Sequence, residues 1–226
     1  FPQEKLVLVP EGISDEIASC IMLKGITAEY LLHRAYPIKK GDKVLYHAAA
    51  GGVGQILCQW ANALGAEVIG TVGSKKKEAI AKKNGCHHVI NYTDTNFVDE
   101  VEKITGKNGI DVVYDGVGIK TFNGSIETLK VRGMMVAFGN ASGYVNTIDV
   151  KKHINAKGLF FTRPSIAHYT ATREELVESA KKVFDAVLSG KFKVEIIKKY
   201  FLSDAKKAHK ELEARLLTGP SVIIPN

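Results

Sequence analysis

Residues 43–72 read KVLYHAAAGGVGQILCQWANALGAEVIGTV, and this stretch decides the fold. An apolar run at 44–48 leads into a string of small residues, and a second apolar run occupies 67–72. Between them, apolar residues recur at intervals of three and four, which is the period of one helix face, and Gly65 supplies a stop signal. The succession predicts a βαβ unit with a glycine-rich bend where the first strand meets the helix.

The same alternation continues downstream. Short apolar runs alternate with helical patterns, which is typical of a parallel sheet with right-handed crossovers. The sequence therefore predicts an α/β fold, a doubly wound parallel sheet of the Rossmann type. The further strands are expected at 88–92, 110–115, 134–138 and 159–162, and the helices at 76–84, 97–104 and 121–129.

After Pro164 the pattern changes, and the last elements look like a different layer. Thr172 and Glu175 have the spacing of a capping box that opens a helix ending at Leu188. Elsewhere the pattern predicts an extended segment at 6–10, helices at 15–32 and 204–217, and strands at 194–197 and 221–224.

Composition sets the broad class. With 226 residues, 45% of them hydrophobic, the chain can bury a full core as one large domain or two modest ones. No apolar run approaches the ~20 residues of a membrane span, and no secretory signal opens the chain, so we expect a cytoplasmic protein. Three cysteines are too few and too scattered for a disulfide framework or a metal site, and the adjacent His87 and His88 make a poor metal pair.

The net charge of +7 raises the question of nucleic acid. Most basic residues come as doublets spread along the whole chain, which solvated helix faces explain, so a nucleic-acid partner is not favoured. Only Lys75, Lys76 and Lys77 form a local cluster at an informative position.

Residues 49–54, AAGGVG, follow the GxGxxG pattern with alanine at its first position. Small residues there allow a tight turn, close approach of a cofactor pyrophosphate and close packing of helix on strand. The helix then presents free N–H groups and a positive dipole end to the phosphates. A purely structural turn is the alternative, but the surrounding strand, helix and strand favour dinucleotide binding.

The end of the second strand indicates which dinucleotide is preferred. An NAD site normally carries an acidic residue ~20 positions past the glycines, where it binds the ribose 2′-hydroxyl. Residues 72–77 instead read VGSKKK, which suits a 2′-phosphate and favours NADPH. A solvated first helical turn is the alternative, although lysines there oppose the helix dipole.

Several motifs in the right order carry a resemblance to a known family. They are HAAAGGVG at 47–54, VINY at 89–92, DGVG at 115–118, FGNASG at 138–143 and TRPS at 162–165. Together they resemble bacterial NADPH:quinone oxidoreductase, the zeta-crystallin-like branch of the zinc-independent medium-chain dehydrogenases and reductases. The resemblance spans essentially the whole chain.

The resemblance implies NADPH as cofactor, no zinc, and a set of binding residues. Gly51 to Gly54 would hold the pyrophosphate, while Ser74, Lys77 and Tyr92 would surround the 2′-phosphate. The full set is Thr27, Ala49, Gly51, Gly52, Val53, Gly54, Gly73, Ser74, Lys77, Tyr92, Gly116, Asn140, Ser142, Phe161, Thr162 and Arg215. Four of these have ordinary alternatives: an exposed helical arginine at 215, a packed strand aromatic at 92, and plain turn chemistry at 140 and 142.

Family members begin with a GroES-like catalytic domain, and this chain resembles them only from near the end of that domain. We therefore expect residues 1–24 to be a remnant of the catalytic domain, 25–165 the Rossmann NADPH-binding domain, and 166–226 a segment that packs back on the catalytic domain. The family also implies a homodimer.

The activity implied is hydride transfer from NADPH to a quinone or similar conjugated carbonyl compound. No catalytic residue is identified, and Ser142, fourth in its glycine-flanked run, is not a nucleophile elbow. An enone or enoyl-thioester reductase and a non-catalytic NADPH-binding module or redox sensor remain open. A methyltransferase is disfavoured because the lysine cluster stands where such a site would want an acid.

Overall fold

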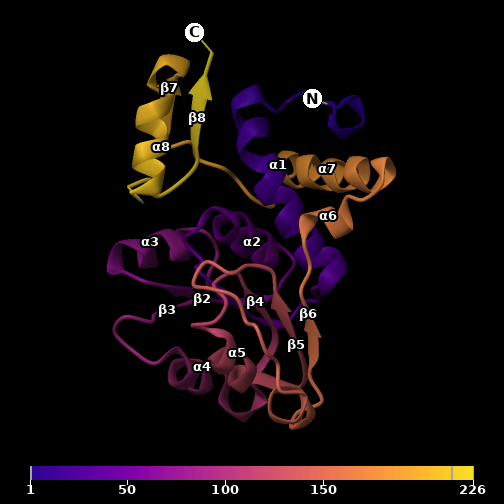
Figure 1. The fold of residues 1–226 in the computed structure, drawn as a ribbon, viewed down its shortest axis with the longest axis vertical. Helices are drawn as coiled ribbons and strands as arrows, with labels where there is room; N and C mark the ends of the chain where they lie inside the picture. The colour runs from indigo at the N-terminus through magenta and orange to yellow at the C-terminus, as the bar shows by residue number, and fades with distance from the viewer. Residues whose placement is uncertain (1, 215, 226) are drawn as a thin grey trace.

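The computed structural model describes residues 2–214 and 216–225, and a six-stranded sheet forms its centre (Figure 1). The strand order is β3-β2-β1-β4-β5-β6, and every pairing is parallel. The first strand, β1, lies in the middle of the sheet; β2 and β3 are added on one side of it, and β4, β5 and β6 on the other. The predicted doubly wound α/β fold is therefore confirmed. The strands are β1 (Lys43–His47), β2 (Glu67–Val72), β3 (His88–Asn91), β4 (Ile110–Asp115), β5 (Leu129–Ala137) and β6 (Phe160–Thr162).

Helices cover both faces of this sheet because neighbouring side chains on a strand point to opposite faces. On β1, Val44 and Tyr46 belong to the core beneath α1 and α2, whereas Leu45 belongs to the core beneath α4 and α5. The helices are α1 (Asp15–Tyr30), α2 (Gly52–Ala63), α3 (Lys75–Lys83), α4 (Phe97–Thr105), α5 (Phe122–Thr128), α6 (Ile166–Tyr169), α7 (Arg173–Leu188) and α8 (Ala205–Glu213). Short 3-10 or π turns occur at η1 (Gln3–Lys5), η2 (Leu31–Ala35), η3 (Gly106–Asn108), η4 (Val150–Asn155) and η5 (Leu202–Asp204).

The helix ends follow the expected chemistry. Gly65, Gly85 and Gly190 lie just after α2, α3 and α7 with φ of +86°, +90° and +74°, a conformation that costs glycine little. At the start of α7, the Thr172 side chain accepts from the amide of Glu175, and the Glu175 carboxylate accepts from the amide of Thr172, so the predicted capping box is present.

The last part of the chain forms a separate layer, which we call the C-terminal unit and define as residues 198–225. Its strands β7 (Lys198–Phe201) and β8 (Ser221–Ile224) pair in parallel, and α8 packs beside them. Glu211 of α8 accepts hydrogen bonds from Lys198 and Tyr200 of β7, each at 2.5 Å, which fixes the helix on the strands. In Figure 1 this unit, in yellow, lies beyond α2 and α3 rather than in the central sheet.

Side chains of α2 hold the segment that leads into the C-terminal unit, at Phe192 and Lys193, against the central domain. The Gln59 amide donates to the carbonyl oxygen of Lys193 and accepts from its N–H, both at 3.0 Å. The adjacent Trp60 is fully buried and packs on Phe192 with ring centroids 5.4 Å apart. Segments far apart in the sequence are therefore joined through one face of α2.

Some predicted boundaries were wrong. The strand expected at 194–197 lies instead at 198–201, because the backbone pairs with β8 only from Lys198 onward and Tyr200 is its buried residue. The helix expected at 204–217 covers only Ala205–Glu213. Strand β5 begins at Leu129 rather than 134 and contains a register shift, with Arg132 at φ +61°. The expected domain limit at 24/25 stays a prediction, and both residues lie within helix α1.

Candidate functional site

The glycine-rich bend lies at the carboxyl end of the central strand. Strand β1 ends at His47, one residue earlier than predicted, because Ala48 turns away with φ +63°, a left-handed conformation that is strained for alanine. Residues 48–51 make the turn, and α2 begins at Gly52. Because the strands are parallel, this bend shares its edge of the sheet with the ends of the other five strands.

The amino end of α2 is uncapped. The first N–H groups of a helix have no intrahelical partner. Here Gly51, the N-cap residue, offers no side chain to accept from them, and no acidic residue lies in the first turn. A Cβ atom at Gly54 would meet the carbonyl oxygen of Ala49 at 2.6 Å, so only glycine fits there. These N–H groups and the positive end of the helix dipole are suited to an anion.

The end of β2 contributes the second part of the site. A Cβ atom at Gly73 would meet the Tyr92 hydroxyl oxygen at 2.5 Å, so glycine allows the tyrosine to lie across the strand end. Tyr92 remains half exposed, and Lys77, in the first turn of α3, is exposed. Ser74 is the N-cap residue of α3, and its side chain makes no capping hydrogen bond.

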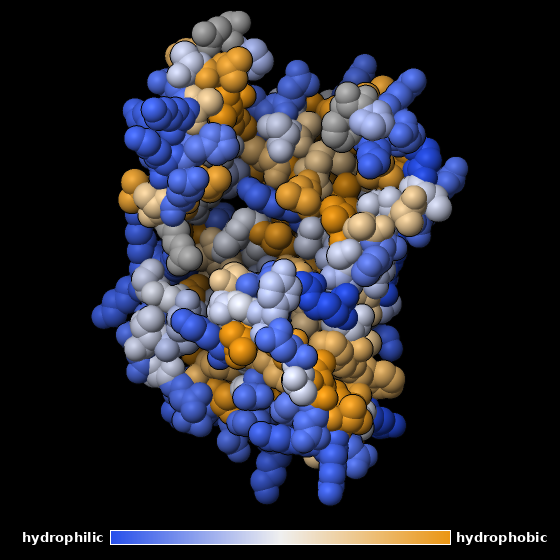
Figure 2. Space-filling view, viewed as in Figure 1, coloured by the Kyte–Doolittle hydropathy of each residue, from blue (hydrophilic) through white to orange (hydrophobic). Residues whose placement is uncertain are grey.

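The bend and the end of β2 face a cavity of about 380 Å³, which the C-terminal unit closes from the other side. Figure 2 shows the surface hollowed between that unit and the layer of α2 and α3. The Gln55 side chain donates to the carbonyl oxygens of Ala50 at 2.9 Å and Thr218 at 3.0 Å, which joins the two walls. The lining residues are Lys24, Ala48, Ala50, Gly51, Gly52, Gln55, Val72, Gly73, Lys77, Ile80, Tyr92, Leu212, Leu217, Thr218 and Gly219.

Five of the predicted binding residues line this cavity: Gly51, Gly52, Gly73, Lys77 and Tyr92. The others lie around it or apart from it. Ala49 is buried within the bend, and Val53 faces the core beneath α2. Thr27 lies on α1, where its hydroxyl donates to the carbonyl oxygen of Leu23 at 2.7 Å. The predicted Arg215 lies outside the described residues.

The remaining predicted residues lie just after β4 and β5 or within the last residues of β6. Gly116 lies under the Phe138 ring, and the Ser142 hydroxyl donates to the carbonyl oxygen of Val117 at 2.8 Å while accepting from the Lys120 amide at 3.1 Å. The carbonyl oxygen of Asn140 accepts from the Gly143 amide in the same turn, and Phe161 packs edge-on against Phe122 in the second core. Thr162 is the partly buried last residue of β6.

A buried polar network supports this edge of the sheet. His47 bridges Thr71 and Ser125 through its two ring nitrogens, at 3.0 and 2.9 Å. Burial lowers the pKa of His47, and this outweighs the nearby Asp115 carboxylate, which acts in the opposite direction. Asp115 is itself fully buried and accepts from the amides of residues 117 and 118 and from the hydroxyl of Thr121. The network holds the ends of β1, β2 and β4 in a fixed relation.

Several lining residues were missed by sequence reasoning. Lys24 arrives from α1, and residues 217–219 from the C-terminal unit, so only the tertiary fold brings them to the bend. Gln55 gave a weak local signal as a polar residue in the first turn of α2, on a helix whose other residues are mostly apolar.

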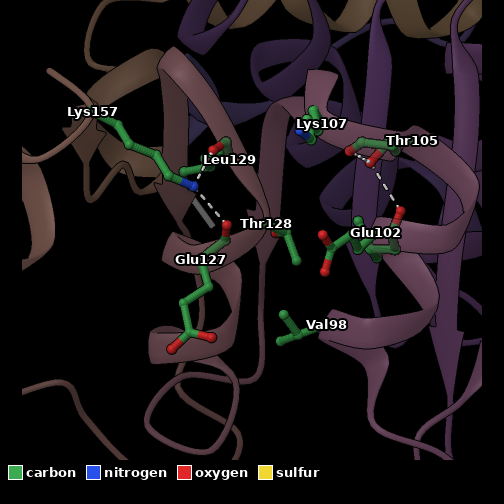
Figure 3. Close-up of a pocket in the computed structure, with 11 residues that line it drawn as sticks. Val98, Glu102, Thr105, Lys107, Glu127, Thr128, Leu129 and Lys157 are labelled. Atoms are coloured by element: carbon green, nitrogen blue, oxygen red, sulfur yellow. Dashed lines mark hydrogen bonds between the residues drawn. The ribbon is translucent and has the colours of Figure 1, made fainter.

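A second cavity, of about 330 Å³, lies at the opposite edge of the sheet, near the starts of β4 and β5 (Figure 3). There the Lys157 ammonium donates to the carbonyl oxygens of Glu127 and Leu129, both at 2.7 Å. Its positive charge is therefore already engaged by backbone atoms of the protein. None of the predicted binding residues lines this second cavity.

Within residues 2–214 and 216–225, no group of three or more His, Cys, Asp and Glu side chains could hold a metal ion. The cysteines are free and buried; Cys58 and Cys86, scattered in the sequence, come together in a side-chain hydrogen bond that raises the pKa of the Cys58 thiol. The described helices include none that is long and apolar enough to cross a membrane.

The fold and the site together define a dinucleotide-binding domain of the oxidoreductase type, with strand order, bend and cavity at the expected switch point. The family described as zinc-binding dehydrogenase matches residues 52–188. The chain belongs to this family, and its relatives place it among the quinone oxidoreductases, as the sequence motifs predicted.

Particular relatives support this placement. A 2-haloacrylate reductase from a Burkholderia species is 45% identical over 228 residues, covering 100% of this chain and 68% of the relative. A quinone oxidoreductase from Salmonella typhimurium is 46% identical, covering 98% of this chain and 68% of its own length. The crystal structure of Escherichia coli quinone oxidoreductase in complex with NADPH superposes with a TM-score of 0.91 at 46% identity, covering 98% of this chain and 69% of that one.

Proposed function

We propose that this protein binds NADPH in the cavity at the glycine-rich bend and reduces a quinone or a similar conjugated carbonyl compound. One observation carries the proposal: the uncapped start of α2 and Lys77 line the same cavity, and its lining, among the described residues, includes no acidic residue. Relatives named quinone oxidoreductase, one of them solved with NADPH, support it.

The residues present fit this cofactor. Added Cβ atoms at Gly52 and Gly73 would meet Lys24 and Tyr92 at 2.8 and 2.5 Å, so glycine at both positions lets these two side chains lie against the cavity wall. The amides at the start of α2 suit the pyrophosphate, and Lys77 with Ser74 and Tyr92 suits the 2′-phosphate. A carboxylate near the ribose would repel that phosphate, and residues 72–77 contain none.

When bound, NADPH supplies a hydride from its nicotinamide ring. The chain contributes binding and orientation: the bend fixes the phosphates, and the ends of β4, β5 and β6 flank the direction in which the rest of the dinucleotide extends. We assign Thr27, Gly116, Asn140, Ser142, Phe161 and Thr162 to the nicotinamide side. Except for Thr27, which lies on α1, these residues share the carboxyl edge of the sheet, and this position supports the assignment. No residue is assigned as proton donor.

A conjugated alkene is the second candidate acceptor. The specific observation in its favour is the relative named 2-haloacrylate reductase, at 45% identity, since 2-haloacrylate is an α,β-unsaturated acid. Measuring NADPH consumption with 1,4-benzoquinone and with 2-chloroacrylate separates the two: turnover of only one identifies the acceptor class, and turnover of neither contradicts the proposed reaction.

Lys77→Ala tests the cofactor assignment. We expect NADPH affinity to fall by about 1.5–3 kcal/mol because a charge-assisted hydrogen bond to the 2′-phosphate is lost, while NADH affinity stays the same. Isothermal titration calorimetry measures both. Lys76→Ala, an exposed neighbour outside the cavity lining, is the matched control. Unchanged NADPH affinity in Lys77→Ala would remove the assignment.

The remaining features of the proposal concern the assembly. We propose a homodimer, supported by β6, an edge strand whose Phe160 is 57% exposed. We also propose that residues 166–226 pack on a catalytic domain. The exposed Phe201 and Leu202, beside the isolated β7-β8 pair, support this packing.

Two further features are proposed. A cytoplasmic location fits the free cysteines, and a zinc-independent reaction is proposed from the family resemblance.

A further inference from the structure

Lys24 crosses from α1 to the glycine-rich bend. A Cβ atom built on Gly52 would lie 2.8 Å from Cε, 3.1 Å from Cδ and 3.2 Å from Nζ of Lys24. The lysine side chain therefore lies directly over the first residue of α2, and the absence of a side chain at Gly52 makes room for it.

The packing of α1 holds the lysine in this position. A Cβ atom at Gly25 would meet Cγ1 of Val183 at 2.7 Å, so α1 and α7 are in close contact at the very next residue. This contact fixes the rotation of α1 about its axis. Lys24, about 100° further round the helix, is directed by the same packing toward α2.

The electrostatic environment of Lys24 is unfavourable without an anion. The amino end of α2 carries a positive partial charge, no acidic residue lies in its first turn, and a second cation, Lys77, lines the same cavity. None of the salt bridges formed within the described part of the chain involves Lys24. Like charges gathered at one cavity are compensated when an anion occupies it.

We propose that Lys24 is a ligand of the dinucleotide's pyrophosphate, so that the cavity divides the phosphates between two lysines from different helices. Lys24 and the amides of α2 bind the bridging phosphates, and Lys77 of α3 binds the 2′-phosphate. This inference rests on the proposed NADPH binding and adds a residue to it. Lys24 serves NADH and NADPH equally, because both contain a pyrophosphate, whereas Lys77 distinguishes them.

Three ligands test this division by isothermal titration calorimetry: NADPH, NADH, and adenosine 2′-monophosphate, which lacks the pyrophosphate. Lys24→Met keeps the methylene packing over Gly52 and removes the charge. We expect it to weaken NADPH and NADH by the same factor, about 10- to 100-fold, and to leave adenosine 2′-monophosphate unchanged. Lys77→Met should weaken NADPH and adenosine 2′-monophosphate and spare NADH.

Lys40→Met is the matched control, because Lys40 also packs over a glycine, with its Cγ and Cβ near Gly65, but lies outside the cavity lining. It removes one positive charge and should leave all three affinities unchanged. Lys24→Gln provides a second neutral variant should the Met variant not fold.

The outcomes separate the two hypotheses. NADPH binding by Lys24→Met at the wild-type affinity overturns the role of Lys24. An equal loss for adenosine 2′-monophosphate also overturns it, since the lysine would then act on the structure of the cavity rather than on the pyrophosphate. Failure of the unmodified chain to bind NADPH overturns the proposed function itself.

Discussion

At the scale of single residues, the bend depends on positions where a missing side chain brings two segments together. Gly54 allows α2 to pack on the carbonyl oxygen of Ala49, and Gly73 allows Tyr92 to lie across the end of β2. Gly52 makes room for Lys24. The three glycines thus have three different neighbours, and a methyl group at each should have a different effect.

Gly54→Ala should destabilise the protein by about 1–3 kcal/mol, because its methyl group would overlap the backbone of the bend, even though alanine favours a helix by about 1 kcal/mol. Urea denaturation measures the loss. In Gly52→Ala the methyl group meets only the flexible end of Lys24, so a smaller effect is expected. Equal stabilities of the two variants would contradict this explanation.

At the scale of helices and strands, the sequence signals were reliable where they were local. The alternation of apolar runs and helical periods predicted the doubly wound sheet, and Gly65 and Gly85 marked the ends of α2 and α3. The strand expected at 194–197 was wrong because the pairing with β8 begins only at Lys198. Before that point the apolar Val194 lies outside the strand, and the Ile197 amide donates to the carbonyl oxygen of Pro220.

The residues that line the candidate site also divide into those that the sequence predicts locally and those that only the tertiary fold brings in. Residues 51–54, Gly73 and Lys77 could be predicted because they follow β1 and β2 directly in the sequence. Lys24 and Thr218 could not, since no periodicity records which side chains from distant helices and loops meet at a strand end. Ser142 was predicted from a motif, and its hydroxyl is engaged within its own turn.

The capping box of α7 gives a prediction at the scale of one helix. Thr172→Ala removes the acceptor for the Glu175 amide, and the expected loss of stability is about 1 kcal/mol. The midpoint of urea denaturation reports it, because α7 packs against α1 in the main core. Thr147→Ala, at an exposed threonine outside any helix, should be neutral, and a comparable loss there would contradict the capping explanation.

At the scale of the whole molecule, the buried His47 and the half-buried His33 link stability to pH. Burial lowers the pKa of both His47 and His33 relative to the unfolded value of about 6.5. Below that pH the unfolded chain binds protons that the folded chain does not, so the stability from neutral burial is present above about pH 6.5 and is lost as the pH falls through the folded pKa.

Urea denaturation between pH 7.5 and 5.5 should therefore show the free energy of unfolding decreasing toward the acid end. The dependence should be weaker in His47→Asn, which removes one of the two groups, and unchanged in His209→Asn, where the histidine is exposed. A free energy of unfolding that stays constant or rises as the pH falls would contradict the prediction.

The two walls of the cavity lie far apart in the sequence: the bend lies at residues 48–55, and the covering residues are Leu212, Leu217, Thr218 and Gly219. During synthesis the ribosome therefore releases the complete glycine-rich bend long before the segment that encloses it. Closing so long a loop is slow relative to forming the local βαβ unit, so enclosure belongs to a late folding step. If the bend binds NADPH as proposed, a nascent chain that met the cofactor before this step would hold it in an open site, and residues 217–219 would later determine how long it stays bound.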